Sequence, residues 1–305
     1  LPNIAFFLRM FSYKDASSSA QIEGTQATMA DAIEVSAHIE NKQPDATDIV
    51  FYTKALEYGV KRLEDFPLCL RFIRETHSIL MEHGRATHFS DPGEFRRSQN
   101  WIGGTTIAKA SFVPVPHTEM QKSLSDFETF IRDDAATMPL VAIAYAHAQF
   151  ETIHPFLDGN GRVGRLLITF LLMQKGVLEK PVLFLSSYFK KHQKVYYAKL
   201  SGYHDDGDVF GWVDFFLDGV IETAHEAIEI SGAIRQIRDE DMEKIQALAK
   251  REAESGVKVL NYLFEQPIVT TKHVMHVTGF TRAGAQKVID RFASLGILKE
   301  DEKES

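Results

Sequence analysis

Residues 154–165 read HPFLDGNGRVGR, which brings a histidine, a carboxylate, a glycine loop and two arginines into one short stretch. A loop with two glycines can expose backbone N–H groups, and a helix that begins there adds the positive end of its dipole. Arg162 and Arg165 lie three residues apart, so on a helix they share one face that suits a polyphosphate. His154 is a candidate base, and Asp158 is a candidate ligand for a magnesium ion carried by the phosphates. The residues alone predict a nucleotide triphosphate site beside a histidine.

The composition bounds the class of protein. The chain has 305 residues, 44% of them hydrophobic and 25% charged, which is ordinary for a globular protein with one or two domains. The net charge of −8 gives no general basic character for binding nucleic acid. Cys69 is the single cysteine, so an intrachain disulfide is excluded and a cytoplasmic location is expected. No apolar run reaches about 18 residues, so no membrane is expected among the partners.

Helical patterns cover most of the chain and predict a mostly α fold. Glycines and prolines interrupt residues 85–116, where short apolar pieces predict a small β-hairpin flap at 93–116. Residues 256–305 show three helical segments and the start of a strand, which is the order of a winged helix-turn-helix module. A charged connector helix is expected before it, at residues 233–255.

The glycine loop also matches the dinucleotide fingerprint G-x-G-x-x-G, and Glu179 follows about twenty residues later. That fingerprint requires a buried strand directly before the loop and a succession of βαβ units after it. Here the preceding residues are helical in pattern, and Pro155 and Asp158 separate them from the loop. A dinucleotide site is therefore not expected.

The stretch from His154 to Arg165 resembles the Fic motif, H-x-F-x-[D/E]-G-N-G-R-x-x-R, at every defined position. Upstream, residues 19–24 are similar to the inhibitory motif [S/T]-x-x-x-E-[G/N] of Fic proteins whose inhibitory helix precedes the core. The matching residues of that motif are Ser19, Glu23 and Gly24. The resemblance implies an N-terminal helical region over 1–84 and a helical Fic core over 85–232 with a flap, followed by the connector and the terminal module.

The resemblance implies a protein adenylyltransferase, which moves AMP from ATP to a Tyr, Thr or Ser hydroxyl of a target protein and of itself. His154 is then the general base that takes the hydroxyl proton, and Asp158 binds Mg²⁺. The implied phosphate-binding residues are Gly159, Asn160, Gly161, Arg162 and Arg165. Glu23 is implied to pair with Arg165 and to keep it from the γ-phosphate, which would make the enzyme autoinhibited.

Two further parts of the site rest on weaker patterns. Tyr197 lies where relatives place an aromatic residue against adenine, but His204 replaces the Asn that relatives often carry seven residues later. The flap could hold an extended target segment by strand addition. Its docking residues would be Gln99, Asn100, Trp101, Ile102 and Gly103. His147 is expected to be a core histidine rather than a metal ligand.

Alternatives to AMP transfer stay open at this point. One is a DNA-binding regulator whose Fic core only senses nucleotide. Others are removal of AMP from a target, and transfer of a different phosphate moiety as in the related Doc kinases. DNA at the terminal module and a second copy of the chain also stay open as partners.

Overall fold

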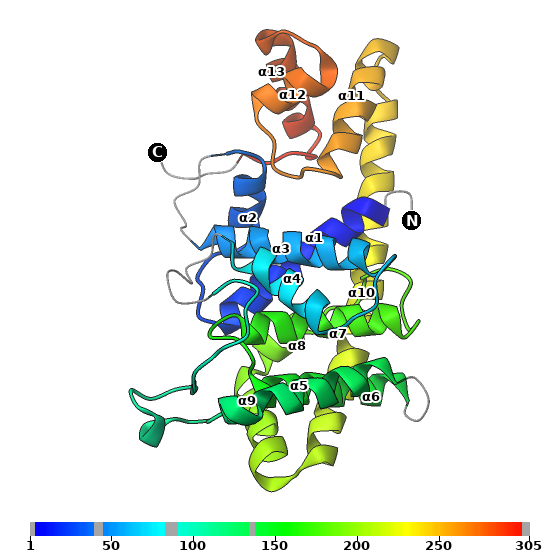
Figure 1. Ribbon diagram of the computed structural model, residues 1–305. Helices are drawn as coiled ribbons and strands as arrows, with labels where there is room; N and C mark the ends of the chain where they lie inside the picture. Colours follow the sequence, from blue (N-terminus) through cyan, green and yellow to red (C-terminus); the bar gives the residue numbers. More distant parts are fainter. Residues whose placement is uncertain (1–3, 40–44, 83–90, 134–137, 301–305) are drawn as a thin grey trace. The chain divides into compact units, whose positions relative to one another are not determined.

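The computed structural model describes residues 4–39, 45–82, 91–133 and 138–300. Within these ranges the chain is mostly α-helical, as the sequence predicts (Figure 1). The α-helices are α1 (Ile4–Ile22), α2 (Met29–Ser36), α3 (Ala46–Arg62), α4 (Leu70–Leu80), α5 (His117–Arg132), α6 (Pro139–Ile153), α7 (Asn160–Gln174), α8 (Ser186–Lys191), α9 (Gln193–Ser201), α10 (Val209–Gln246), α11 (Lys250–Leu263), α12 (Thr271–Thr278) and α13 (Arg282–Ser294). No helix in the described ranges is both long and apolar enough to cross a membrane.

The chain divides into two compact units. The larger comprises Met10–Val35 and Glu40–Ala227, and the smaller comprises Leu1–Arg9, Ser36–Ile39 and Ile228–Ser305. All residues of the candidate site belong to the larger unit. The boundary expected between residues 84 and 85 falls in a segment outside the described residues.

Helix α7 lies at the centre of the larger unit, where it packs against α3, α4 and α6. Every residue of this helix from Val163 to Leu172 is buried. Phe170 shows how closely the helices approach: its ring meets Phe72 of α4 edge-on at 5.2 Å. A Cβ on Gly59 of α3 would lie 2.2 Å from the same ring, so only glycine fits there. Each such buried aromatic side chain contributes about 1.5–3 kcal/mol, which fixes α7 and the loop before it.

The segment expected to form a hairpin contains one antiparallel bridge, between Ile102 and Phe112, and no longer strand pairing within the described residues. Figure 1 shows the segment as a loop that projects from the helices around the short 3-10 helix η1 (Ile107–Lys109). Gly103 and Gly104 both have left-handed φ angles, 69° and 66°, which turn the chain before a ladder can extend. The β-hairpin flap is therefore not confirmed.

The smaller unit contains the terminal helices α11 to α13, which pack around one apolar core. Its buried members are Ile245, Val259, Leu260, Leu263, Phe264, Val274, Ala285, Val288 and Phe292. Gly279, with φ 72°, turns the chain between α12 and α13, and Thr281 caps α13 by accepting the Gly284 N–H. The strand expected from Gly296 is not formed within the described residues, so a winged module is not confirmed.

Helix α10 runs without a break across the expected boundary at residues 232 and 233. Gly232 lies inside this 38-residue helix. A single helical glycine costs about 1 kcal/mol relative to alanine, which is too little to end so long a helix.

Candidate active site

His154 is placed by the end of α6. Pro139 begins that helix, and its last N–H bond runs from His154 to the Phe150 carbonyl at 2.9 Å. His154 then takes left-handed angles, φ 49° and ψ 59°, which cost a non-glycine residue about 1–3 kcal/mol. Burial lowers the pKa of its imidazole to about 4, so the ring is neutral at pH 7 and can accept a proton.

The loop after His154 is fixed from both sides. Asn160 closes it, because its side-chain amide donates to the Phe156 carbonyl and its oxygen accepts the Phe156 N–H, both at 2.8 Å. The Phe156 ring is fully buried and stacks on His77 at 3.7 Å. His77 accepts the Gly93 N–H on Nδ1, so its Nε2 carries a proton and donates to the Asp158 carbonyl at 3.0 Å.

Gly159 must be glycine on two grounds. Its φ of 78° lies in the left-handed region, and a Cβ would approach the Met81 sulfur to 2.8 Å. Gly159 is the N-cap of α7, so the backbone N–H groups at the positive end of this helix follow it directly.

Arg165 faces Glu23, which lies just beyond the end of α1. Its Nη2 donates to Glu23 Oε1 at 2.6 Å, its Nε donates to the Ser19 hydroxyl at 2.8 Å, and Nη2 also reaches the Ser19 carbonyl at 3.1 Å. Burial alone would lower the pKa of Arg165 and raise that of Glu23. The opposite charges outweigh burial, so the pKa of Glu23 is lowered and that of Arg165 is raised. Both groups are therefore charged at pH 7.

Glu23 also covers the glycine loop. A Cβ added to Gly161 would lie 2.4 Å from Glu23 Oε1, so the carboxylate touches the backbone where an anion would bind. Its side chain keeps 42% exposure, whereas that of Arg165 keeps 2%. The sequence signal Ser19-x-x-x-Glu23-Gly24 thus lies beside Arg165 in the structure.

Arg162 behaves differently from Arg165. Its Nη2 contacts the Met81 sulfur at 3.5 Å and lies 3.7 Å from Asp158 Oδ1, and the side chain does not line the cavity that His154 and Arg165 share. Asp158 does line it and is half exposed, with Oδ1 accepting the Gly159 N–H at 2.5 Å. Groups of three or more potential metal-binding side chains are absent from the described part of the chain.

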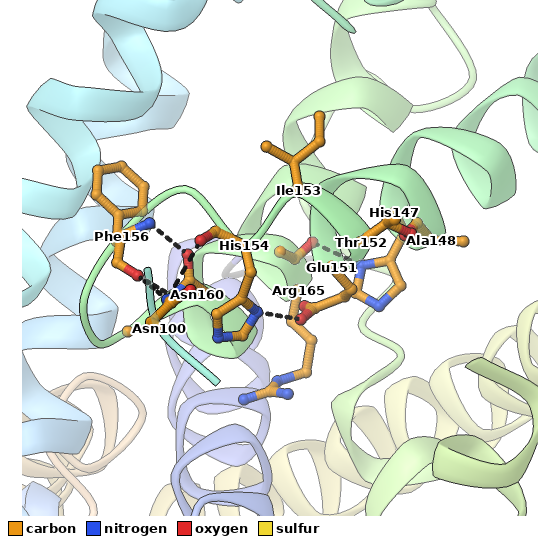
Figure 2. Close-up of polar contacts among 12 residues, drawn as sticks. Asn100, His147, Ala148, Glu151, Thr152, Ile153, His154, Phe156, Asn160 and Arg165 are labelled. Atoms are coloured by element: carbon orange, nitrogen blue, oxygen red, sulfur yellow. Dashed lines mark hydrogen bonds and ion pairs between the residues drawn. The ribbon is translucent and has the colours of Figure 1, made fainter. Parts of the chain in front are cut away.

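One cavity of about 550 Å³ collects the candidate residues. Those predicted from the sequence that line it are Glu23, Ile102, His154, Asp158, Gly159, Asn160, Gly161, Arg165 and Tyr197. Four of the predicted flap residues, Gln99, Asn100, Trp101 and Gly103, are not in its wall. Asn100 instead donates to the Phe156 carbonyl at 3.0 Å, as Figure 2 shows.

Glu151 was not singled out as a site residue, yet it lines the cavity one helical turn before His154. Its Oε2 lies 3.9 Å from His154 Nδ1, and the two side chains point toward each other (Figure 2). Burial raises the pKa of Glu151 to about 7. The i, i+3 spacing on one helix face was the signal in the sequence.

Two other histidines are held by hydrogen bonds. His147 is buried, with Nδ1 2.9 Å from the Gly164 carbonyl and Nε2 2.8 Å from the Tyr196 hydroxyl. His204, at the edge of the cavity, contacts the Thr152 hydroxyl at 2.7 Å and stacks on Phe112 at 4.5 Å. Phe112 of the flap and His204 therefore contact each other in the wall of the same cavity.

Family models and several known proteins match this chain. A model described as the Fic/DOC family matches residues 67–172, and one described as the Fic/DOC family N-terminal matches residues 1–61. The protein adenylyltransferase Fic of Aedes aegypti is 32% identical over 212 residues, covering 66% of this chain and 38% of that protein. Its namesake in Drosophila grimshawi is 28% identical over 249 residues, covering 78% and 46%. The chain thus spans less than half the length of these curated relatives.

Solved structures share the fold. A Fic family protein from Desulfovibrio desulfuricans G20 superposes with a TM-score of 0.65 at 19% identity, covering 96% of this chain and 82% of that one. A Fic domain containing signaling protein from Bacteroides thetaiotaomicron VPI-5482 gives 0.63 at 20% identity, covering 76% and 91%. The two family models together match more than half of the residues, and the fold agrees: the chain belongs to the Fic/DOC family.

Proposed function

We propose that this chain is a protein adenylyltransferase, which transfers AMP from ATP to a hydroxyl of a target protein and of itself. The observation that carries the proposal is one cavity that joins a neutral, partly buried histidine to a glycine loop, a carboxylate and a buried arginine. The matched relatives, named protein adenylyltransferase Fic, support the same activity.

In the proposed reaction, the oxygen of a target Tyr, Thr or Ser attacks the α-phosphorus of ATP. A new O–P bond forms, the bond to the β-phosphate oxygen breaks, and pyrophosphate leaves. His154 takes the hydroxyl proton. Its Nδ1 is buried against Glu151, so Nε2 is the nitrogen that receives the proton.

The phosphates fit the start of α7. The N–H groups after Gly159 and the guanidinium of Arg165 face the cavity and can hold anionic oxygens. Asp158 fits a Mg²⁺ ion that arrives with ATP, because this ion takes only one or two carboxylates besides phosphates and water. When bound, the ion would offset negative charge on the phosphates. Arg162 must turn away from Met81 to reach them.

The adenine end is assigned to the wall formed by Tyr197 and His204. Tyr197 is 46% exposed and lines the cavity, so its ring is available for stacking. The flap from Gln99 to Gly103 is proposed to receive the target segment beside Ile102, whose backbone already pairs with Phe112.

We also propose that the enzyme is autoinhibited. Arg165 and the backbone at Gly161 are the groups proposed to bind the γ-phosphate. Glu23 contacts both of them, since it pairs with Arg165 and lies against Gly161. ATP must displace this carboxylate before it can bind in the pose for attack. Whether Glu23 also assists removal of AMP from a target is a separate question, answered by incubating a modified target with the wild-type protein.

The test uses Glu23→Gly protein with ATP labelled on either the α- or the γ-phosphate. Label from the α-position should appear on protein, and label from the γ-position should not; the reverse pattern would indicate phosphate transfer as in Doc kinases. Glu64→Gly, which removes an exposed carboxylate in the turn after α3, is the matched control and should stay near wild-type activity. No α-label with Glu23→Gly would contradict the proposal.

A second candidate, DNA binding through α12 and α13, rests on a narrower observation. Arg282 and Lys287 are exposed on α13 after the Gly279 turn, but Asp290 is exposed on the same helix. Phosphate contacts by these two cations predict retardation of labelled DNA at low salt that Arg282→Ala with Lys287→Ala abolishes. Equal retardation by the double variant would remove this candidate.

A further inference from the structure

A buried arginine lies behind the candidate base and is not accounted for by the proposed reaction. Arg96, near the start of the flap segment 93–116, is only 3% exposed. No carboxylate forms an ion pair with it among the described residues, and burial lowers the pKa of its guanidinium. A buried cation without an opposite charge is costly, so its donors must be satisfied in another way.

Backbone carbonyls from two parts of the chain satisfy those donors. Nε donates to the His154 carbonyl at 3.0 Å, and Nη2 donates to the Ile153 carbonyl at 3.3 Å. Nη1 donates to the Ser98 carbonyl at 3.0 Å, and Nη2 also donates to that of Val115. The peptide N–H of the same arginine donates to the Pro155 carbonyl at 2.8 Å.

The first set of carbonyls ends helix α6. The last carbonyls of a helix have no partner within it, and a cation there also complements the helix dipole. His154 leaves this helix in a left-handed conformation, which persists only where the surroundings impose it. Arg96 supplies that constraint at the residue that carries the candidate base.

The second set lies at the two ends of the flap, before and after the Ile102–Phe112 bridge. One planar guanidinium therefore ties the base of the flap to the backbone of His154. Asn100 adds a parallel tie, since it donates to the Phe156 carbonyl. Lysine could not reproduce this arrangement, because an ammonium is a point charge without a planar fork.

We infer that Arg96 is a positioning residue for AMP transfer: it holds the His154 backbone so that the imidazole faces the α-phosphate, and it sets the flap at a fixed distance from that ring. The inference rests on the proposed function. Arg96 is not among the residues that line the cavity and contacts His154 only through its backbone carbonyl, so ATP binding does not depend on it directly.

The experiment compares Arg96→Ala, Arg96→Lys and Arg97→Ala, each in the Glu23→Gly background. Arg97 is the adjacent, exposed arginine and serves as the matched control. Arg96→Ala should lower kcat for α-label transfer by about 100-fold, as expected for a misplaced catalytic group. The KM for ATP should stay within about two-fold, because binding interactions are intact. Arg96→Lys should lose less, and millimolar guanidinium chloride should restore part of the Arg96→Ala activity, with sodium chloride at equal ionic strength as control.

Equal kcat values for Arg96→Ala and Arg97→Ala would overturn the inference. So would a parallel loss of ATP binding and kcat without recovery in guanidinium, since that describes a general structural role. If Arg96→Ala fails to fold by circular dichroism, Arg96→Lys is judged by the same split between kcat and KM. Absence of transfer by Glu23→Gly itself would instead refute the proposed function, so the two failures are distinguishable.

Discussion

Removing the Glu23 carboxylate should raise the affinity for ATP by a calculable amount. A solvent-exposed ion pair contributes about 0–1 kcal/mol, and breaking a buried one costs about 3–5 kcal/mol. The Glu23–Arg165 pair lies between these cases, because the glutamate side chain is 42% exposed and the arginine 2%. Discounted for that exposure, the pair opposes ATP by about 1–2 kcal/mol, which is about 5–30-fold in affinity.

The assay is calorimetric titration of MgATP into Glu23→Gly, with His154→Ala in all samples so that no transfer consumes the nucleotide. Glu64→Gly in the same background controls for the loss of a carboxylate elsewhere on the surface. Tighter binding is expected for Glu23→Gly alone. If its affinity matches that of the Glu64→Gly control, Glu23 does not compete with ATP, and the inhibitory contact has no energetic role.

Three further predictions concern His154, Glu151 and Gly164. Because burial lowers the pKa of His154 to about 4, α-label transfer by Glu23→Gly should lose activity in acid with a midpoint below the unperturbed value of about 6.5; a midpoint at or above 6.5 would contradict this. Glu151 binds its proton more tightly in the folded protein, where its pKa is raised from 4.5 to about 7, so the wild-type free energy of unfolding should fall by about 3 kcal/mol relative to Glu151→Gln as the pH rises through this window. Urea unfolding at pH 4.5 and pH 8 measures this difference. The same difference between the two proteins at both pH values would refute the prediction. Gly164→Ala should destabilise by about 1–3 kcal/mol, because its Cβ would lie 2.3 Å from Glu151 Oε1. Gly232→Ala, with open space around the added atom, should stabilise α10 by about 1 kcal/mol; equal melting temperatures for these two variants would show that the close contact is relieved at no cost.

The local motif was readable from the sequence because its parts depend on local geometry. A glycine with φ 78° before α7, and two arginines one turn apart on that helix, follow from spacing alone. The Glu23 contact with Arg165 joins residues 142 positions apart, and only the family resemblance could suggest it. The spacing of residues along the chain does not predict a contact between such distant positions.

The sequence could not reveal contacts made by tertiary packing. In the sequence Arg96 resembles its neighbour Arg97, yet Arg96 is buried against the backbone of His154 and Pro155 and Arg97 is exposed. Arg162 and Arg165 are both arginines of the motif, but Arg162 contacts the Met81 sulfur and does not line the cavity. The expected hairpin is reduced to one bridge, because two glycines with positive φ angles turn the chain directly after Ile102. Their φ angles depend on how the loop packs and could not be predicted from the sequence.

The central claim is that His154 drives transfer of AMP once Glu23 is removed. Intact-mass spectrometry of Glu23→Gly after incubation with MgATP tests it directly, with Glu23→Gly/His154→Ala beside it. An added mass of one AMP group is expected on the first protein and none on the second. No adduct on either protein, or the same adduct on both, would contradict a role of His154 in AMP transfer.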